Sequence, residues 1–373
     1  MRLVDDAWAY GLCGDAAAPE CFTFGSATVV IGDTGTLITV EAGDGLDRSC
    51  VWNAREVRLL GPVPTPVGTR LVGEPRERGT GDGRQPLHLT VRNSEGLLYL
   101  GTGSLTRSAT EVRPGGDKRV LTRCTLQLDE PLSKLDLDRV RPPVPLMNLP
   151  SLEWLRHVDG NRAGALEQFI TGWYSALPEP AEPSAVREPA VDLPDGLKQL
   201  YRLAQRRPRC LGVQNRVLSS SGLQTDPTGE MLVFGEENQG GFFWSLLWTL
   251  DGPEADPTVW FREYDEPPIA EQEPLSGFLL QFSLYEASMG ADYRAIPRTL
   301  AAQQVDKLTE GLLPVHLRPF WPWVPTRFYV APGLVLHVSD GGGDGFSAWA
   351  GATHRSALAP LADAPVEWSR FDG

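Results

Sequence analysis

The first 145 residues alternate apolar and polar positions in short runs, which is the pattern of β-strands. The clearest runs are Phe22–Ile31, Thr36–Glu41, Leu87–Arg92, Leu97–Leu100 and Val120–Leu128. The first two runs, and the next two, each flank a short turn that contains glycine, so each pair predicts a β-hairpin. We therefore expect residues 1–145 to form an all-β domain, either a sandwich or a small barrel.

After residue 145 the apolar spacing becomes that of helices. The proline-rich segment Pro142–Pro150 is expected to be a semi-rigid linker. A helix at about 163–175 is predicted from one apolar face, made by Leu166, Phe169, Ile170, Trp173 and Tyr174. A second proline-rich stretch, Leu177–Pro194, precedes another helical stripe, made by Leu197, Leu200, Tyr201 and Ala204.

The remaining residues mix strands with helices. Predicted strands lie at about 232–234, 242–250 and 258–261. Predicted helices lie at Leu275–Ala287 and, with a weaker pattern, at about 297–312. A terminal hairpin is expected to pair Arg327–Val338 with Gly345–Gly351, and the ring-rich segment Arg318–Pro325 is expected to pack across a sheet.

This pattern predicts an α+β protein in four parts. The parts are the β domain of residues 1–145, a linker with one amphipathic helix over 146–192, a core of helices on a mostly antiparallel sheet over 193–296, and an extension with a hairpin over 297–373. A length of 373 residues with 41% apolar side chains agrees with two or three domains that have packed cores.

The cysteines and the apolar runs bear on the expected cellular location of the protein. The five cysteines include no CxxC pair, so we expect neither a zinc site nor a redox motif. The first residues are acidic and lack a long apolar core, so we expect no secretory signal, and no apolar run is long enough to span a membrane. We therefore expect a cytoplasmic protein with reduced thiols.

The net charge of −14 is concentrated in the second part of the chain, where residues 146–373 carry 29 acidic and 17 basic side chains. Residues 226–273 hold 12 acidic side chains and a single basic one, Arg262. Such a surface would repel nucleic acid and anionic membranes and would attract a basic partner. A solvated acidic face without a partner would have the same composition.

Five short motifs stand in order over about a hundred residues. They are Leu193-Pro194 with Leu197, Leu200 and Tyr201; Met231–Gly240, which contains Glu236-Glu237-Asn238-Gln239-Gly240; Trp244 and Trp248; Asp256-Pro257-Thr258-Val259-Trp260; and Leu275–Leu279. Together they resemble the SUKH (SMI1/KNR4) superfamily, with Thr258 in place of a common proline. Phe169–Trp173 and the terminal Trp368–Gly373 resemble its long actinobacterial members, whereas residues 1–145 resemble no family known to us.

The resemblance implies helices on a mostly antiparallel sheet and an immunity protein that binds and blocks a toxin domain without catalysis. The partner would be a basic toxin, held by Glu236, Glu237, Asn238, Trp244, Trp248, Asp256, Glu263, Asp265 and Glu266. We expect the two turn glutamates to be exposed, Asn238 to stabilise the turn, and Trp244 or Trp248 to serve as an aromatic anchor.

Motifs of common enzymes are missing from the sequence. It has no phosphate-binding loop, no dinucleotide-binding glycine pattern and no paired histidines, so we expect no catalysis, cofactor or metal. Two alternatives stay open: a scaffold or regulator, as fungal SUKH proteins are understood, or a ligand-binding or enzymatic site near His88 in residues 1–145.

Overall fold

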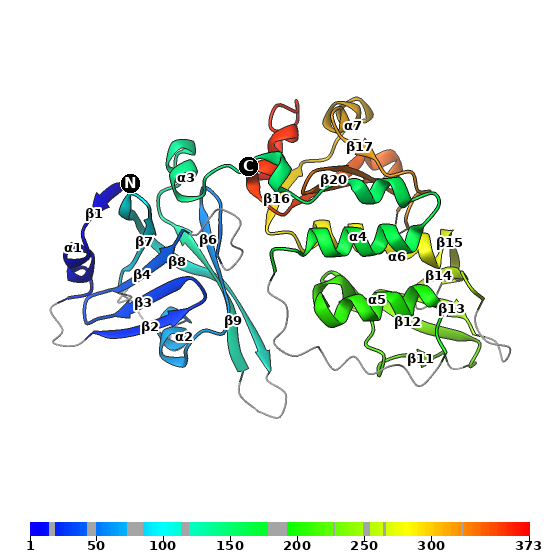
Figure 1. The fold of residues 1–373 in the computed structure, drawn as a ribbon, viewed down its shortest axis with the longest axis horizontal. Coiled ribbons are helices and arrows are strands. Elements are labelled where there is room, and N and C mark those ends of the chain that lie inside the picture. The colour runs from blue at the N-terminus through cyan, green and yellow to red at the C-terminus, as the bar shows by residue number, and fades with distance from the viewer. Residues whose placement is uncertain are drawn as a thin grey trace. The chain divides into compact units, whose positions relative to one another are not determined.

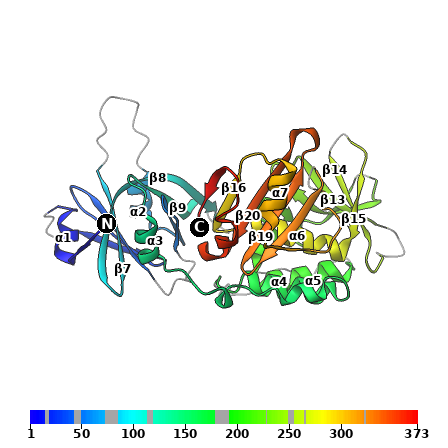
Figure 2. The same ribbon diagram turned by 90° about the horizontal axis from the view of Figure 1, so that it is seen from above.

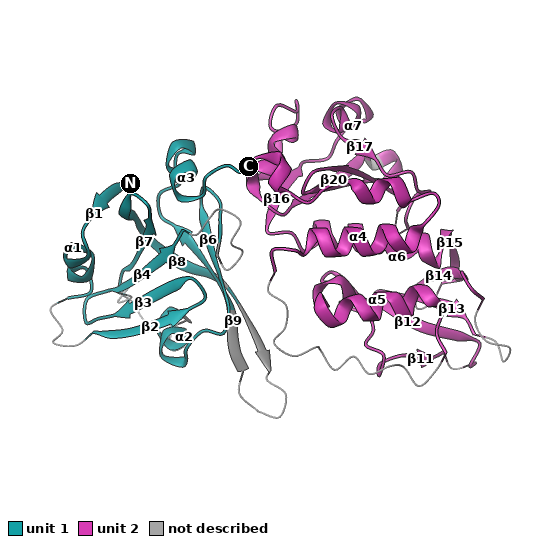
Figure 3. Cartoon of the chain, in the orientation of Figure 1, with its two compact units in different colours: residues 1–144 teal, residues 145–373 magenta. Residues whose placement is uncertain are grey.

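The computed structural model describes residues 1–14, 19–42, 50–72, 85–112, 119–177, 192–226, 228–248, 254–263, 266–321 and 324–373. The chain divides into two compact units, Met1–Val144 and Pro145–Gly373 (Figure 3). Each unit contains helices and strands around a hydrophobic core of its own. The predicted α+β class is confirmed.

The N-terminal unit is built on one nine-stranded sheet (Figure 1). Its strands are β1 (Arg2–Val4), β2 (Glu20–Phe24), β3 (Ala27–Ile31), β4 (Thr36–Glu41), β5 (Cys50–Trp52), β6 (Glu56–Leu60), β7 (Leu87–Asn93), β8 (Gly96–Val112) and β9 (Arg119–Leu128). Their order is β2-β3-β4-β7-β8-β9-β6-β5, with β1 paired to β8. Only β4 and β7 run parallel among these pairs. Both predicted hairpins form, as β3–β4 and β7–β8.

The N-terminal unit is rich in strands, as predicted, but it is not all-β. Its described residues include three helices, α1 (Asp6–Gly11), α2 (Thr65–Val72) and α3 (Lys134–Val140). Its described strands form a single sheet that ends at β2 and β5. Each helix is at most eight residues long, so its apolar positions are too few to produce a helical period.

The C-terminal unit begins with helices that pack on a central sheet (Figures 1 and 2). Its α-helices are α4 (Arg162–Trp173), α5 (Asp195–Arg206), α6 (Leu275–Met289) and α7 (Ala302–Thr309). The strands of the central sheet are β10 (Asn215–Val217), β11 (Gln224–Thr225), β12 (Met231–Glu237), β13 (Phe242–Leu247), β14 (Thr258–Glu263) and β15 (Ile269–Pro274). The order is β10-β12-β13-β14-β15, with β11 also on β12, and every described pair is antiparallel.

A second antiparallel sheet completes this unit. Its strands are β16 (Tyr293–Pro297), β17 (Leu313–Pro314), β18 (Thr326–Ala331), β19 (Leu334–Asp340), β20 (Phe346–Ala352) and β21 (Trp368–Phe371), in the order β17-β18-β19-β20-β16-β21. Short 3-10 helices are η1 (Leu146–Asn148), η2 (Glu153–His157), η3 (Pro208–Leu211), η4 (Gly342–Asp344) and η5 (Arg355–Leu361).

Helix α6 is the centre of the C-terminal unit. It is apolar on every side, and it packs against α4, α5 and strands of both sheets. Phe320, from the ring-rich segment, is fully buried against Trp244 and Phe278, as expected for packing across a sheet, while Trp323 lies outside the described residues. The predicted boundaries at 192/193 and 296/297 separate no compact units, because α4 and the second sheet share this core.

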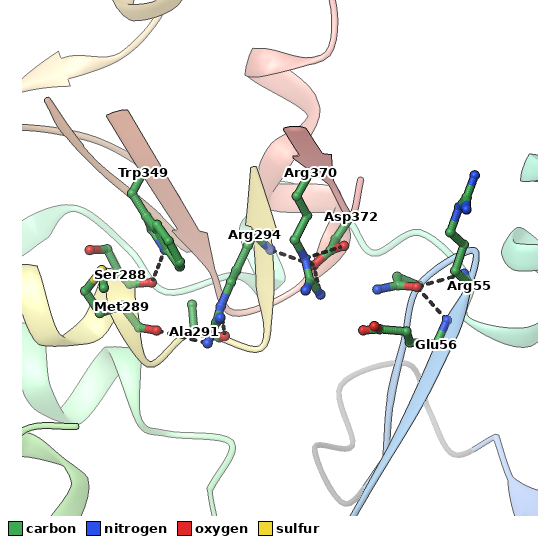
Figure 4. Close-up of polar contacts among 10 residues, drawn as sticks. Arg55, Glu56, Ser288, Met289, Ala291, Arg294, Trp349, Arg370 and Asp372 are labelled. Carbon is green, nitrogen blue, oxygen red and sulfur yellow. Dashed lines mark hydrogen bonds and ion pairs between the residues drawn. The ribbon is translucent and has the colours of Figure 1, made fainter. Parts of the chain in front are cut away.

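The Trp368–Gly373 motif fixes the last strand to β16 (Figure 4). The buried Asp372 carboxylate accepts hydrogen bonds from the backbone N–H of Arg294 at 3.0 Å and from the Arg370 guanidinium at 2.9 Å. The Arg294 guanidinium in turn donates to the backbone carbonyls of Met289 and Ala291 at the end of α6. This motif therefore has a structural role.

Candidate functional site

Glu237 is the central side chain of the β12–β13 turn. The residue is only 7% exposed, and its Oε2 accepts the backbone N–H groups of Gln239 at 2.8 Å and Gly241 at 3.2 Å. Its Oε1 has a single long contact, 3.4 Å, to Nε2 of Gln214. The expectation that Glu237 is exposed is therefore wrong, because the turn has N–H groups that need an acceptor.

The two neighbours of Glu237 face outward. Glu236 is half-buried and forms an ion pair of 2.7 Å with Arg216 on the adjacent strand β10. Asn238 is exposed, and its backbone N–H donates to the carbonyl of Gln214. The turn-stabilising role that the sequence suggested for Asn238 thus belongs to the Glu237 carboxylate.

Trp244 lies on the inner face of the central sheet and is fully buried. Its Nε1 donates to Oε1 of Glu271 at 2.9 Å, and the other oxygen of Glu271 accepts the backbone N–H of Trp321. Burial raises the pKa of Glu271 to about 7, although both hydrogen bonds favour the charged form. The prediction that Trp244 binds a partner is wrong, because it belongs to the core.

Trp248 and Asp256 are also tied to the fold. Trp248 is half-buried at the edge of the core, just after β13. The Asp256 carboxylate accepts the backbone N–H of Ser276 at 2.8 Å and its Oγ at 2.7 Å. These bonds satisfy N–H and hydroxyl donors in the first turn of α6, so Asp256 caps this helix from a distant part of the sequence.

The predicted site residues lie at opposite ends of the central sheet. We call the end with the β12–β13 turn the turn end, and the opposite one the far end. The turn end holds Glu236, Glu237, Asn238, Glu263 and Glu266; the far end holds Trp248 and Asp256. The seven residues of β12 separate these ends by about 20 Å. Asp265 lies outside the described residues.

The acidic stretch 226–273 is largely used by the fold. Glu237, Glu271 and Glu273 are buried, and Glu273 forms an ion pair of 2.7 Å with Arg162. Asp226 accepts the backbone N–H of Glu230 in a turn. Among the described residues of this stretch, the exposed acidic side chains are Glu230, Glu254 and Asp256 at the far end and Glu266 at the turn end. These described charges form two smaller groups, one at each end of the sheet.

A pocket of about 460 Å³ opens at the turn end. It is lined by Glu237 with the turn that follows, by Gln214 and Asn215 at the start of β10, and by Phe242 and Tyr285. Glu263 lies beside it, because this residue pairs with Phe242 across β13 and β14 and therefore shares its face of the sheet. The geometry thus brings together residues from three strands and α6.

Glu286 supports this pocket from below. Its carboxylate, 1% exposed, accepts the backbone N–H groups of Val213, Gln214 and Asn215 at 2.6, 2.7 and 2.9 Å. Burial raises the pKa of Glu286 to about 7, against these hydrogen bonds. Burial, followed by the charges of Glu286 and Glu237, raises the pKa of Tyr285 to about 12. The pocket is therefore lined by the Glu237 carboxylate and the Tyr285 ring, with the buried Glu286 carboxyl behind the backbone of residues 213–215.

The amide of Asn215 completes the lining. Asn215 is 2% exposed, and its Nδ2 forms no hydrogen bond among the described residues. The amide still favours the charged form of Glu286 electrostatically, without the geometry of a hydrogen bond. A buried amide donor of this kind needs an acceptor, which a ligand or water in the pocket can supply.

Other polar clusters in the described residues belong to the cores. His88 is buried and its Nδ1 lies 3.0 Å from the Tyr99 hydroxyl. His337 is buried against Ser288 and Tyr285. In the described part of the chain, no three His, Cys, Asp or Glu side chains are placed to hold a metal ion, and no helix is long and apolar enough to cross a membrane.

Comparisons with protein-family models, with curated proteins and with solved structures find no match for this chain. The site is therefore defined by its geometry. Sequence reasoning located Glu237 but missed Glu286, Tyr285, Gln214 and Asn215. Glu286 is the one charged residue of the largely buried helix α6, and that isolated charge was the available signal.

Proposed function

We propose that this chain is a non-catalytic immunity-type protein, which binds a basic toxin domain at the turn end of the central sheet and blocks it. The observation that carries the proposal is the pocket lined by Glu237 at the turn end, with Glu263 beside it. Carboxylates around a concave, partly aromatic site suit the arginine and lysine side chains of a basic protein.

The charge balance supports the same partner class. Residues 146–373 carry 29 acidic and 17 basic side chains, so the C-terminal unit attracts a basic domain over a long range. Fast electrostatic encounter is a property that an inhibitor of a toxin needs, because the toxin must be captured before it acts. A cytoplasmic location belongs to this proposal.

The positions of the SUKH-like motifs are compatible with it. Leu197, Leu200 and Tyr201 form the buried face of α5, and the Leu275–Leu279 motif begins α6. The motif with Glu236 and Glu237 ends β12 and forms the turn. Most of these motif residues are used by the fold. The turn borders the pocket of about 460 Å³, whereas the Phe169–Trp173 motif borders a cavity of only about 10 Å³.

The test is affinity capture of the full-length tagged protein from its own lysate at low salt, followed by an inhibition assay. We expect one stoichiometric basic partner that carries a toxin-like domain, whose toxicity this protein suppresses when both are expressed together. Capture of several unrelated proteins, or a partner whose activity is unchanged, would contradict the proposal.

A further inference from the structure

The pocket at the turn end has the chemistry of a site for one cationic side chain. Glu237 forms no ion pair among the described residues, although it is buried and faces the pocket. Its Oε2 is occupied by two backbone N–H groups, whereas its Oε1 has only the 3.4 Å contact to Gln214. One carboxylate oxygen is therefore left to accept a strong donor, and a buried carboxylate without a cation is costly.

The other walls select among cations. The half-buried ring of Tyr285 borders the pocket, whereas Phe242 is 1% exposed and packs against Trp244 and Phe261. A planar guanidinium can contact an aromatic ring while it donates to a carboxylate. Glu286 makes no direct contact with the pocket's contents, because its oxygens are occupied by the N–H groups of residues 213–215. The planar charge of arginine fits this combination better than the compact ammonium of lysine.

We infer that the pocket lined by Glu237, Phe242 and Tyr285 receives the guanidinium of an arginine side chain that the bound partner inserts at the turn end. This inference rests on the proposed function for the source of the arginine. The preference of the pocket for a guanidinium rests on its lining residues and does not depend on the proposed function.

The first experiment uses the full chain and a blocked arginine, Nα-acetyl-arginine methylamide, as the probe. Amide chemical shifts of Gly240 and Gly241 report on the pocket, since both glycines line it. We expect a saturable shift in the millimolar range, and no shift with the neutral isostere Nα-acetyl-citrulline methylamide. Equal shifts with the citrulline or lysine derivative, or tighter binding of free arginine than of the blocked form, would overturn the inference.

The matched variants are E237Q in the pocket and E254Q at the far end of the sheet, which remove the same charge. The glutamine Oε1 in E237Q can still accept from Gln239 and Gly241, so the turn is retained, as an unchanged unfolding midpoint would verify. E237Q is expected to weaken binding of the blocked arginine at least about tenfold. E254Q, at an exposed residue outside the site, should stay within about twofold. Equal effects of the two variants would refute a role for the pocket.

The same variants separate this inference from the proposed function. If E237Q loses the blocked arginine and the captured partner binds as before, the partner does not use the pocket, and the inference falls while the proposed function stands. If the pocket binds arginine specifically but no partner is captured, the proposed function falls, and with it the assignment of the arginine to a partner.

Discussion

At the scale of single residues, acidic side chains with the same charge have three different roles in this protein. Glu237 closes a turn, Glu286 binds three backbone N–H groups, and Glu266 is exposed to solvent. The sequence located all of the acidic stretch but could not distinguish these roles. The N–H groups that occupy a carboxylate become visible only when the backbone is folded.

Asp256 gives a direct test of a structural role. Asp256→Ala removes the acceptor for the Ser276 N–H and Oγ, so we expect the free energy of unfolding to fall by about 1 kcal/mol, as for loss of a helix cap. Chemical denaturation measures the loss, with Glu254→Ala at a nearby exposed residue as the control. A normal stability with weakened partner binding would show instead that Asp256 contacts the partner.

His337 makes the fold sensitive to acid. Burial lowers the pKa of His337 to about 3 from its ordinary value near 6.5, so the unfolded chain binds a proton that the folded chain excludes. The contribution of His337 to the free energy of unfolding is fully present above pH 6.5 and is lost as the pH falls toward 3. Glu271 and Glu286, whose pKa values are raised to about 7, act in the opposite direction between pH 4.5 and 7.

His337→Phe isolates the histidine contribution, because both carboxyl contributions remain in the variant. Phenylalanine keeps a ring beside Tyr285, and Ser288 Oγ still donates to the Tyr285 carbonyl. Between pH 6.5 and 4.5 we expect the wild type to lose about 2–3 kcal/mol more than the variant. The exposed residue His316, changed to Gln, is the control. Parallel stability curves for wild type and His337→Phe would refute the burial effect.

At the scale of elements, long periodic helices and hairpins were predictable. The helices predicted from the apolar stripe that ends at Ala204 and from the apolar run after Pro274 are α5 and α6 in the structure. Their apolar positions mark the side chains that each helix buries. Strands β15 and β21 were not predicted, because they are short and carry charged residues that pair only after folding. The first strand of the predicted terminal hairpin, Arg327–Val338, is in fact two strands, β18 and β19, which pair with each other. The turn between them was missed; it contains Gly333, which adopts a φ of +68°.

The contact between α6 and β20 depends on a glycine. A Cβ on Gly351 would lie 2.3 Å from the carbonyl oxygen of Ser288 and 2.7 Å from the Cβ of Ala291. Gly351→Ala should therefore cost at least about 2 kcal/mol, because backbone must move. Gly343→Ala, where a Cβ meets nothing within 4 Å, is the control and should change stability little. Comparable midpoints for both variants in thermal unfolding would contradict this packing.

At the scale of the whole molecule, two units with separate cores share one chain. The boundary at Val144 and Pro145 falls in the proline-rich segment that the sequence indicated. The single C-terminal core was not predictable, because α6, the helix against which α4 packs, lies more than a hundred residues further along the sequence. The pocket could not be predicted for the same reason, because the residues that line it are spread from Gln214 to Tyr285 in the sequence.

A fragment of residues 145–373 should fold on its own, because its hydrophobic cluster is complete within that range. We expect a cooperative unfolding transition within a few degrees of the corresponding transition in the full chain, and the same affinity for the captured partner. Circular dichroism and titration calorimetry would check both. A fragment that stays unfolded, or one that folds without binding, would show that residues 1–144 are needed.

The central claim is that a basic partner docks at the turn end. Its most direct test compares the partner's association rate constant for two double charge reversals, Glu236→Lys with Glu266→Lys at the turn end, and Glu230→Lys with Glu254→Lys at the far end. Both change the net charge equally. Stopped-flow measurements at several salt concentrations should show association slowed about tenfold or more, with a flatter salt dependence, only for the turn-end variant. Equal slowing by both variants, or a larger effect at the far end, would contradict the claim.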